Sequence, residues 1–219
     1  MQPKKLFDGV YVHESKILTV NLARGSKVYG EELFELGSAE YRSWNPYRSK
    51  LSAAILNGLK NMVIEKGNSV LYLGAATGTT ASHVSDIVGE KGRVYCIEFS
   101  ERNMRSLIEV CARRKNMLPI LADVRYVEKY REMVQECDVL YQDVSAKEQA
   151  DIIKKNAVFL KKGGYAYFAI KSQSIDISRK PEEVFEEVKA EIADTFEVVE
   201  TVRLEPYDEM HLFMVLKKR

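Results

Sequence analysis

The amino-acid sequence predicts an α/β protein built on a wound parallel sheet, and three observations lead to that fold class. From about residue 46, short apolar runs alternate with segments of helical periodicity, the pattern that parallel sheets produce. One of these runs leads into a turn with two glycines and then into a helix start. Residues before 46 form short alternating runs broken by glycine turns. We therefore expect a small antiparallel β module over 1–45 and an α/β domain over 46–219.

In the first segment, apolar and polar residues alternate over 10–12, 17–20 and 27–29, which predicts short antiparallel strands. A helix is expected from about Arg48, because the apolar residues between Leu51 and Leu59 fall on one stripe.

The predicted parallel strands follow this helix. Each ends in a polar or small residue, and these ends share the sheet edge where open α/β proteins bind ligands. A helix over 181–193 precedes two further runs, for which we expect an antiparallel hairpin that closes the sheet. The expected strands are 70–74, 93–98, 118–123, 138–143, 164–171, 196–204 and 211–216.

Composition narrows the class of protein. The 219 residues, 46% of them hydrophobic, suffice for one large core. A net charge of +1 offers little general attraction to a polyanion, so nucleic-acid contact requires a local basic patch. The cysteines Cys96, Cys111 and Cys137 lack metal-ligand spacing, which favours buried, reduced thiols and no metal site. Without a secretory or membrane-spanning run, we expect a soluble cytoplasmic protein with no membrane partner.

The glycine turn after residue 73 limits the kinds of ligand that the predicted site could bind. An acid, Glu98, follows Gly74 by 24 residues, as in nucleotide-binding sheets. A dinucleotide site would place glycines at offsets 2 and 5, but these positions hold Ala76 and Thr79. A P-loop is excluded because no Gly-Lys-Ser/Thr follows. The spacing Gly-x-Ala-x-Gly resembles the first motif of S-adenosylmethionine-dependent methyltransferases, although an ordinary strand-to-helix turn remains an alternative.

Seven blocks along nearly the whole chain resemble the fibrillarin family in its archaeal form, and they occur in the order of that family. The absence of an arginine/glycine-rich N-terminal tail favours the archaeal form over the nucleolar one. The blocks are 44–51, 73–84, 94–100, 121–125, 140–144, 168–171 and 204–207, followed by His211.

The resemblance implies a Rossmann-like class I S-adenosylmethionine-dependent methyltransferase sheet with S-adenosyl-L-methionine as cofactor. It implies guide-RNA-directed 2′-O-methylation of ribose in rRNA and tRNA, by the catalytic subunit of the box C/D ribonucleoprotein. The implied partners are a Nop-type scaffold protein, a kink-turn-binding ribosomal-type protein and the box C/D guide RNA. Sequence choice would then be delegated to base pairing with the guide, because no RNA-reading module is visible in the sequence.

The turn supplies the first cofactor contacts that the resemblance implies. Gly74, Ala75 and Ala76 would let the backbone pass close to the methionine part of the cofactor. Thr79 and Thr80 would meet its carboxylate at the start of the following helix. Helix capping by threonine is the alternative for these two residues.

Later strand ends would hold the nucleoside. The resemblance assigns ribose binding to Glu98 and coverage of the adenine to Phe99, where a surface glutamate and a core phenylalanine are the alternatives. Asp123 and Val124 would meet the adenine edge, unless Asp123 is only a helix N-cap. The remaining residues implied for the cofactor site are Asp143, Val144, Ser145 and Ala146.

The catalytic residues implied by the resemblance are Lys50, Asp143 and Lys171, with His211 as a fourth member. Methyl transfer from a sulfonium requires alignment and removal of the hydroxyl proton. We hypothesise that Lys171 accepts or shares this proton and that Asp143 orients it. Lys50 would disfavour the protonated form of Lys171 by like-charge repulsion. Pure electrostatic stabilisation is the alternative for the lysines, and a structural role is the alternative for His211.

Substrate RNA needs a contact surface beyond this group. We expect Arg42, Arg48 and Lys50, near Trp44 and Tyr47, to form a basic, aromatic rim for a phosphate and a splayed nucleotide. The basic stretch 112–115 is interpreted as a solvated helix end.

The sequence leaves two rival functions open. One is another S-adenosylmethionine-dependent enzyme on the same fold. The set Lys50, Asp143 and Lys171 argues against it. A magnesium-dependent methyltransferase would also need an acidic cluster, which residues 144–147 lack. The other is a catalytically silent scaffold that binds cofactor or RNA without turnover. His83 and His13 are expected to be structural.

Overall fold

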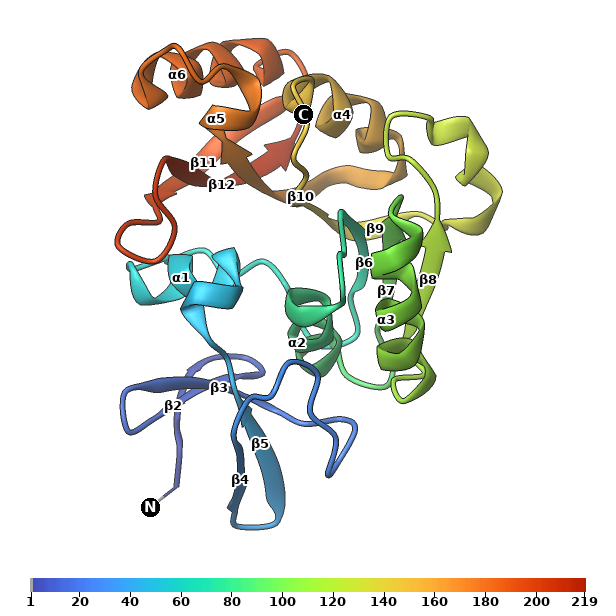
Figure 1. Cartoon of the computed structure of the whole chain (residues 1–219), viewed down its shortest axis with the longest axis vertical. Helices are drawn as coiled ribbons and strands as arrows, with labels where there is room; N and C mark the ends of the chain where they lie inside the picture. Colours follow the sequence, from blue (N-terminus) through green and yellow to red (C-terminus); the bar gives the residue numbers. More distant parts are fainter. Residues whose placement is uncertain (1) are drawn as a thin grey trace.

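The computed structural model of the chain describes residues 2–219, and these form two β-sheets (Figure 1). The smaller sheet is antiparallel, has the strand order β1-β2-β3-β5-β4 and lies at the N-terminal end of the molecule, as expected for this segment. Its strands are β1 (Lys4–Phe7), β2 (Val10–His13), β3 (Lys16–Val20), β4 (Leu33–Leu36) and β5 (Ala39–Ser43).

One predicted strand of this module, 27–29, is wrong, because these residues lie in a loop. The carboxylate of Glu31 accepts hydrogen bonds from the backbone N–H groups of Val28, at 3.0 Å, and of Tyr29, at 2.8 Å. A side chain thus satisfies the donors that a neighbouring strand would otherwise pair.

The larger sheet has seven strands in the order β11-β12-β10-β9-β6-β7-β8. The five strands from β10 to β8 are mutually parallel, and β12 runs antiparallel to both β10 and β11, which confirms the predicted hairpin. Strand ends differ from the prediction by a few residues. The strands are β6 (Ser69–Leu73), β7 (Arg93–Glu98), β8 (Met117–Leu121), β9 (Cys137–Gln142), β10 (Leu160–Lys171), β11 (Phe196–Arg203) and β12 (His211–Lys218).

Helices cover both faces of this sheet (Figure 1). None of those in residues 2–219 has the length and apolar content needed to cross a bilayer. The α-helices are α1 (Lys50–Leu56), α2 (Thr79–Val88), α3 (Glu101–Ala112), α4 (Gln149–Asn156), α5 (Ser172–Ile175) and α6 (Pro181–Ile192). The 3-10 turns are η1 (Pro46–Arg48), η2 (Val127–Lys129), η3 (Arg131–Met133) and η4 (Ala157–Phe159).

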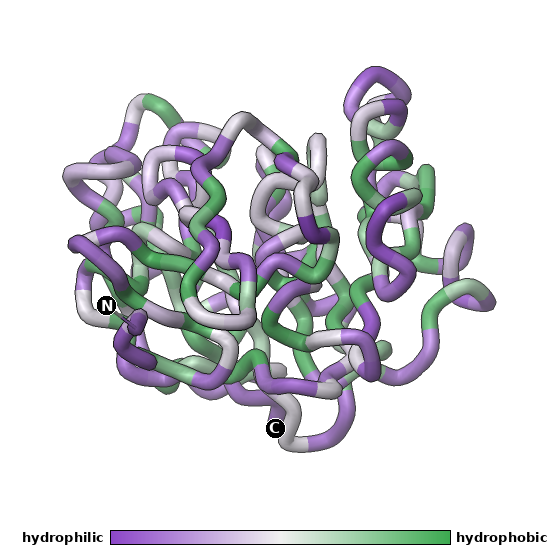
Figure 2. The backbone as a smooth tube through the Cα atoms, turned by 90° about the horizontal axis from the view of Figure 1, so that it is seen from below, coloured by the Kyte–Doolittle hydropathy of each residue, from purple (hydrophilic) through white to green (hydrophobic). Residues whose placement is uncertain are grey.

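The core consists of two apolar layers, one on each face of the larger sheet. Along β6, Val70 and Tyr72 pack with α1, α2 and α3, whereas Leu71 and Leu73 pack with α4 and α6. This follows from the period of two, by which successive side chains of a strand point to opposite faces. Figure 2 shows the apolar segments of the backbone gathered inside the molecule. The three cysteines are free and buried, as expected.

A buried polar network joins the smaller sheet to helix α2, which packs on the larger sheet. Thr19 of β3 has its hydroxyl 2.8 Å from a ring nitrogen of His83 and 2.8 Å from the carboxylate of Asp86, both on α2. Asp86 also pairs with Arg114 and lies 3.6 Å from the guanidinium of Arg42. Burial and the two nearby guanidinium groups hold the pKa of His83 well below its usual range. His83 therefore has a structural place, as expected.

Candidate functional site

The candidate site lies where the parallel strands of the larger sheet end. Because these strands share one direction, their carboxyl ends meet at a single edge, and residues from five chain segments line one pocket of about 420 Å³. Of the residues predicted for the cofactor, those lining it are Gly74, Ala76, Glu98, Phe99, Asp123, Val124, Asp143, Val144, Ser145 and Ala146, and Lys171 joins them.

The turn after β6 brings the backbone close to the next strand end. Gly74 has φ +81°, and a Cβ there would lie 2.5 Å from the carbonyl oxygen of Asp143. Only glycine fits both the conformation and the close approach. The N–H of Ala76 donates to the carboxylate of Glu98 at 2.8 Å, which ties the turn to the end of β7.

The helix that follows is not capped by threonine, so this alternative for Thr79 and Thr80 is wrong. The N-cap of α2 is Gly78, without a side-chain cap bond. The hydroxyl of Thr80 is buried and donates to Ser49 at 3.0 Å. Thr79, Thr80 and Ala75 do not line the pocket, and their cofactor contacts remain predictions.

The exposure of Glu98 and Phe99 is the reverse of what is usual for these residue types. The glutamate is buried, with 4% of its surface exposed, and its second oxygen accepts from the N–H of Ser100 at 2.8 Å. The phenylalanine is 74% exposed beside it. The alternatives of a surface glutamate and a core phenylalanine are therefore wrong. A held carboxylate next to an uncovered aromatic face suits a ribose and a purine.

Asp123 is fixed by a neighbour that the sequence interpretation did not include. Its carboxylate accepts from the backbone N–H of Arg125 at 3.0 Å and from the guanidinium of the same residue. These hydrogen bonds hold the pKa of Asp123 below its usual range. The next helical turn, η2, has Tyr126 as its N-cap, so the N-cap alternative for Asp123 is wrong.

Lys50 meets Asp143 and Lys171 beside this pocket, which the latter two residues line. An oxygen of Asp143 lies 2.9 Å from the Lys171 ammonium and 3.3 Å from that of Lys50, and each of the three side chains is 16% exposed. Lys171 also donates to the hydroxyl of Ser145 at 3.0 Å. Burial opposes the ionisation of Asp143, but the two ammonium groups outweigh it and hold its pKa below the usual range.

Asp208 is the residue of this cluster that sequence reasoning missed. Its carboxylate lies 3.2 Å from the Lys50 ammonium and 3.0 Å from Nδ1 of His211. Burial opposes the charge of Lys50, but Asp143 and Asp208 outweigh it and raise its pKa. The available signal was the i, i+3 spacing of Asp208 and His211 at the start of a predicted strand.

A buried glutamine fixes the backbone of Lys171. The side-chain amide of Gln149 donates to the carbonyl of Lys171 and accepts from its N–H, both at 3.0 Å. Gln142 in turn donates to the carbonyl of Gln149 at 2.7 Å. The lysine therefore projects from a strand end that two neighbouring segments hold in place.

The predicted basic, aromatic rim is partly wrong. Arg42 and Trp44 are buried, because Arg42 pairs with Glu31 at 3.1 Å and Trp44 stacks on His83 with ring centroids 4.7 Å apart. Tyr47 and Arg48 are exposed beside the lysine cluster.

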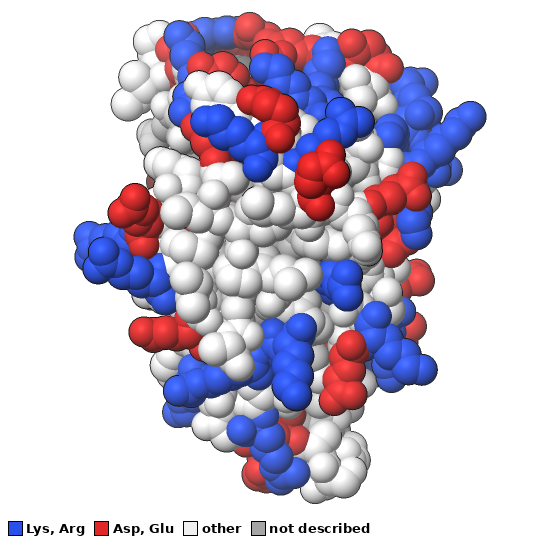
Figure 3. Space-filling view, turned by 90° about the vertical axis from the view of Figure 1, so that its right-hand side faces the viewer, with Lys and Arg blue, Asp and Glu red and all other residues white. Residues whose placement is uncertain are grey.

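The stretch 112–115 is also only partly solvated, since the side chain of Arg114 is buried against Asp86. Figure 3 shows a broad uncharged area across the middle of one face, with lysines and arginines interspersed with acidic residues above and below it. Within residues 2–219, no group of three or more His, Cys, Asp or Glu side chains is arranged to ligate a metal.

Comparisons with known proteins agree on one family. The family model described as Fibrillarin matches residues 1–219. A Pyrococcus furiosus protein named fibrillarin-like rRNA/tRNA 2′-O-methyltransferase is 51% identical over 98% of this chain and 97% of its own length. The crystal structure of Aeropyrum pernix fibrillarin with natively bound S-adenosyl-L-methionine is 45% identical, has a TM-score of 0.91 and covers 98% of this chain and 96% of its own. A fibrillarin/Nop5p complex is 38% identical, with a TM-score of 0.91 over 99% of this chain and 100% of that chain.

Proposed function

The chain belongs to the fibrillarin family, and from this premise we propose how its site works. The protein is an S-adenosyl-L-methionine-dependent 2′-O-methyltransferase of rRNA and tRNA, the catalytic subunit of a box C/D ribonucleoprotein. The observation that carries the proposed mechanism is the contact of Lys50, Asp143 and Lys171 beside the pocket that suits the cofactor.

The residues present fit this cofactor. The pocket volume of about 420 Å³ is in the range of small-molecule sites. Gly74 leaves open backbone where a side chain would collide, and Glu98 presents a held carboxylate beside the exposed ring of Phe99. We propose that Gly74 and Ala76 hold the methionine part, that Glu98 accepts from the ribose hydroxyls and that Phe99 stacks on the adenine.

The bound cofactor supplies an electrophilic methyl group, and the protein must position the hydroxyl and take its proton. We propose that Lys171, once its ammonium has released a proton to solvent, accepts the hydroxyl proton as a neutral amine, and that Asp143 at 2.9 Å and Ser145 at 3.0 Å direct its nitrogen. Lys50 stays charged because two carboxylates raise its pKa, so it stabilises negative charge on the oxygen. We place His211 as a positioning residue that orients Asp208, which it contacts at 3.0 Å.

The partners follow from the same family. A Nop-type scaffold and RNA substrates are partners of the protein. We propose that a kink-turn-binding ribosomal-type protein and a box C/D guide RNA complete the particle. A guide is required because the chain has a net charge of +1 and no RNA-reading module in its sequence. The curated relative comes from an archaeon, a cell without a nucleolus, and we propose a cytoplasmic location.

The test is methylation by the assembled particle, with labelled cofactor and a target RNA that matches the guide. We expect label at one ribose, and no label when that nucleotide is 2′-deoxy. Lys171→Ala should abolish labelling, whereas Lys162→Ala, an exposed lysine of the same strand, should retain it. Equal labelling of the 2′-deoxy target would refute the proposed acceptor.

A further inference from the structure

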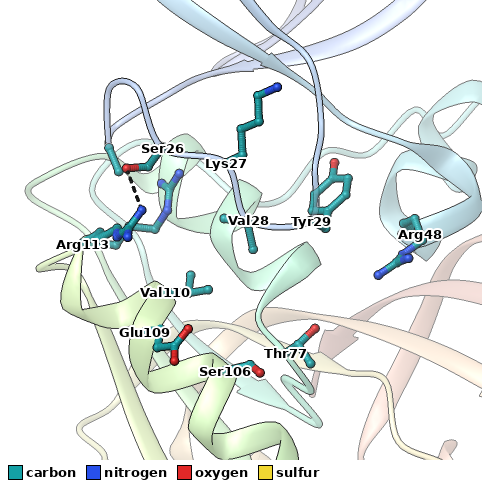
Figure 4. Close-up of a pocket in the computed structure, with 12 residues that line it drawn as sticks. Ser26, Lys27, Val28, Tyr29, Arg48, Thr77, Ser106, Glu109, Val110 and Arg113 are labelled. Atoms are coloured by element: carbon teal, nitrogen blue, oxygen red, sulfur yellow. Dashed lines mark hydrogen bonds between the residues drawn. The ribbon is translucent and has the colours of Figure 1, made fainter.

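A second pocket lies beside the first, between the N-terminal module and the larger domain. Its volume is about 380 Å³. Figure 4 shows the residues that line it. The loop 26–29 forms one wall, α3 forms the opposite wall, and Arg48 of η1 and Thr77 of the glycine turn complete it. The mechanism proposed above uses none of these side chains.

The lining of this pocket is basic. Lys27, Arg48 and Arg113 have no ion-pair partner within residues 2–219, and Glu109 is the single acid that lines the pocket. Arg113 donates to the hydroxyl of Ser26 at 3.4 Å, and Arg48 lies 5.9 Å from the ring centroid of Tyr29. These neutral contacts hold two guanidinium groups without cancelling their charge, which leaves them available to an anion.

The remaining hydrogen-bonding groups suit the same kind of ligand. The hydroxyls of Ser26, Thr77 and Ser106 line the pocket between the cations. Hydroxyl and guanidinium donors together are the groups that proteins commonly direct at phosphate oxygens in nucleic acids.

One residue lines both this pocket and the hollow at the reacting centre. Arg48 also lines a hollow of about 220 Å³ whose other walls include Lys50, Asp143 and Asp208. On its other side, Thr77 directly follows Ala76 of the cofactor pocket. A chain whose target ribose lies at Lys171 can therefore extend past Arg48 toward Arg113 and Lys27.

We propose that this second pocket binds backbone phosphates of the RNA strand that carries the target ribose, next to the methylated nucleotide. Arg48 contacts the phosphate nearest the target, and Lys27 and Arg113 contact the phosphates beyond it. This inference rests on the proposed function. It adds the path of the substrate strand and explains how a chain of net charge +1 holds a polyanion locally.

The experiment measures steady-state methylation by the assembled particle for wild type and for Lys27→Ala and Arg113→Ala. Each variant should raise KM for target RNA roughly threefold or more. The fall of log affinity with log salt should also become less steep, by about 0.7 in the slope. The kcat and the KM for the cofactor should stay unchanged. Glu109→Gln should act in the opposite direction and lower KM for RNA, because it removes the only acid of the lining.

Arg105→Ala is the matched control, since Arg105 is exposed on α3 but does not line the pocket. A second arm replaces phosphates next to the target by neutral methylphosphonates. The neutral linkages should raise KM for RNA with the wild-type particle and raise it little more with Arg113→Ala, because that variant has already lost the contact. If the pocket instead binds a free anion, the methylphosphonates and the substitution should raise KM independently of each other.

If wild type methylates the target but Lys27→Ala and Arg113→Ala behave like Arg105→Ala, the phosphate path is refuted and the proposed function stands. An inactive wild-type particle would instead refute the proposed function.

Discussion

The buried carboxylate of Asp86, which joins the smaller sheet to helix α2, provides a quantitative test of the structure. Asp86 lies on α2, and its side chain is fully buried with those of Arg42 and Arg114. It accepts hydrogen bonds from the Thr19 hydroxyl at 2.8 Å and from the backbone N–H of Leu22 at 3.1 Å. The substitution Asp86→Asn keeps the shape of the side chain and removes its charge.

The expected loss of unfolding free energy follows from this geometry. Removing one partner of a buried ion pair costs about 3–5 kcal/mol, because the other charge stays buried without compensation. Glu31 remains near Arg42 at 3.1 Å, so the main uncompensated group is Arg114. Asp86→Ala should cost about 1 kcal/mol more for each of the two lost hydrogen bonds. These costs are a large part of the roughly 5–15 kcal/mol by which domains are stable.

Urea unfolding of purified protein measures this effect. If the free energy of unfolding falls by about 3 kcal/mol per molar urea, Asp86→Asn should lower the urea midpoint by roughly 1–2 M. The control is Asp194→Asn, whose pair with Lys154 at 2.8 Å involves a carboxylate that is 67% exposed, and it should cost about 1 kcal/mol or less. Because the network links the N-terminal module to α2 of the larger domain, one cooperative transition is expected. Equal midpoints for the two variants, or a separate transition for the N-terminal module, would refute the reasoning.

Three further predictions concern the site. Asp208→Asn should lower kcat by up to about 10²-fold at unchanged KM for the cofactor, because Lys50 loses one of the two carboxylates that hold its ammonium in place. An unchanged kcat would contradict this. Phe99→Ala should weaken cofactor binding, measured by calorimetry, by about 1–3 kcal/mol. The free energy of unfolding in urea should stay within about 0.5 kcal/mol of the wild-type value, because the ring is 74% exposed.

The third compares the pH dependence of unfolding for wild type and Lys50→Met. The raised pKa of Lys50 means that its stabilising effect is complete below about pH 10.4 and is lost only as pH rises through that raised value. The lowered pKa of Asp143 keeps the pair ionised down to below about pH 3.9. The difference in unfolding free energy should therefore be constant between about pH 7 and 9.5, and a steady slope across that range would contradict the assignment.

Most of the fold could be predicted from the sequence because it depends on local patterns. Period-two and helical spacings located every strand of the larger sheet to within a few residues. The error at 27–29 arose because Glu31, a residue outside the run, satisfies the backbone donors there. The rim was wrong at Arg42 and Trp44 because burial of an arginine depends on partners such as Glu31 and Asp86, which the sequence does not place.

By itself, the sequence determined the order of elements, the glycine turn and the strand ends at which chemical groups occur, since each depends on residues within a few positions of one another. The tertiary structure alone decided which of these groups meet. Lys50 and Asp208 are 158 positions apart, yet their charged atoms lie 3.2 Å apart beside Asp143. Long-range packing sets such distances, because each helix and strand takes its place only after the two apolar layers have closed around the sheet.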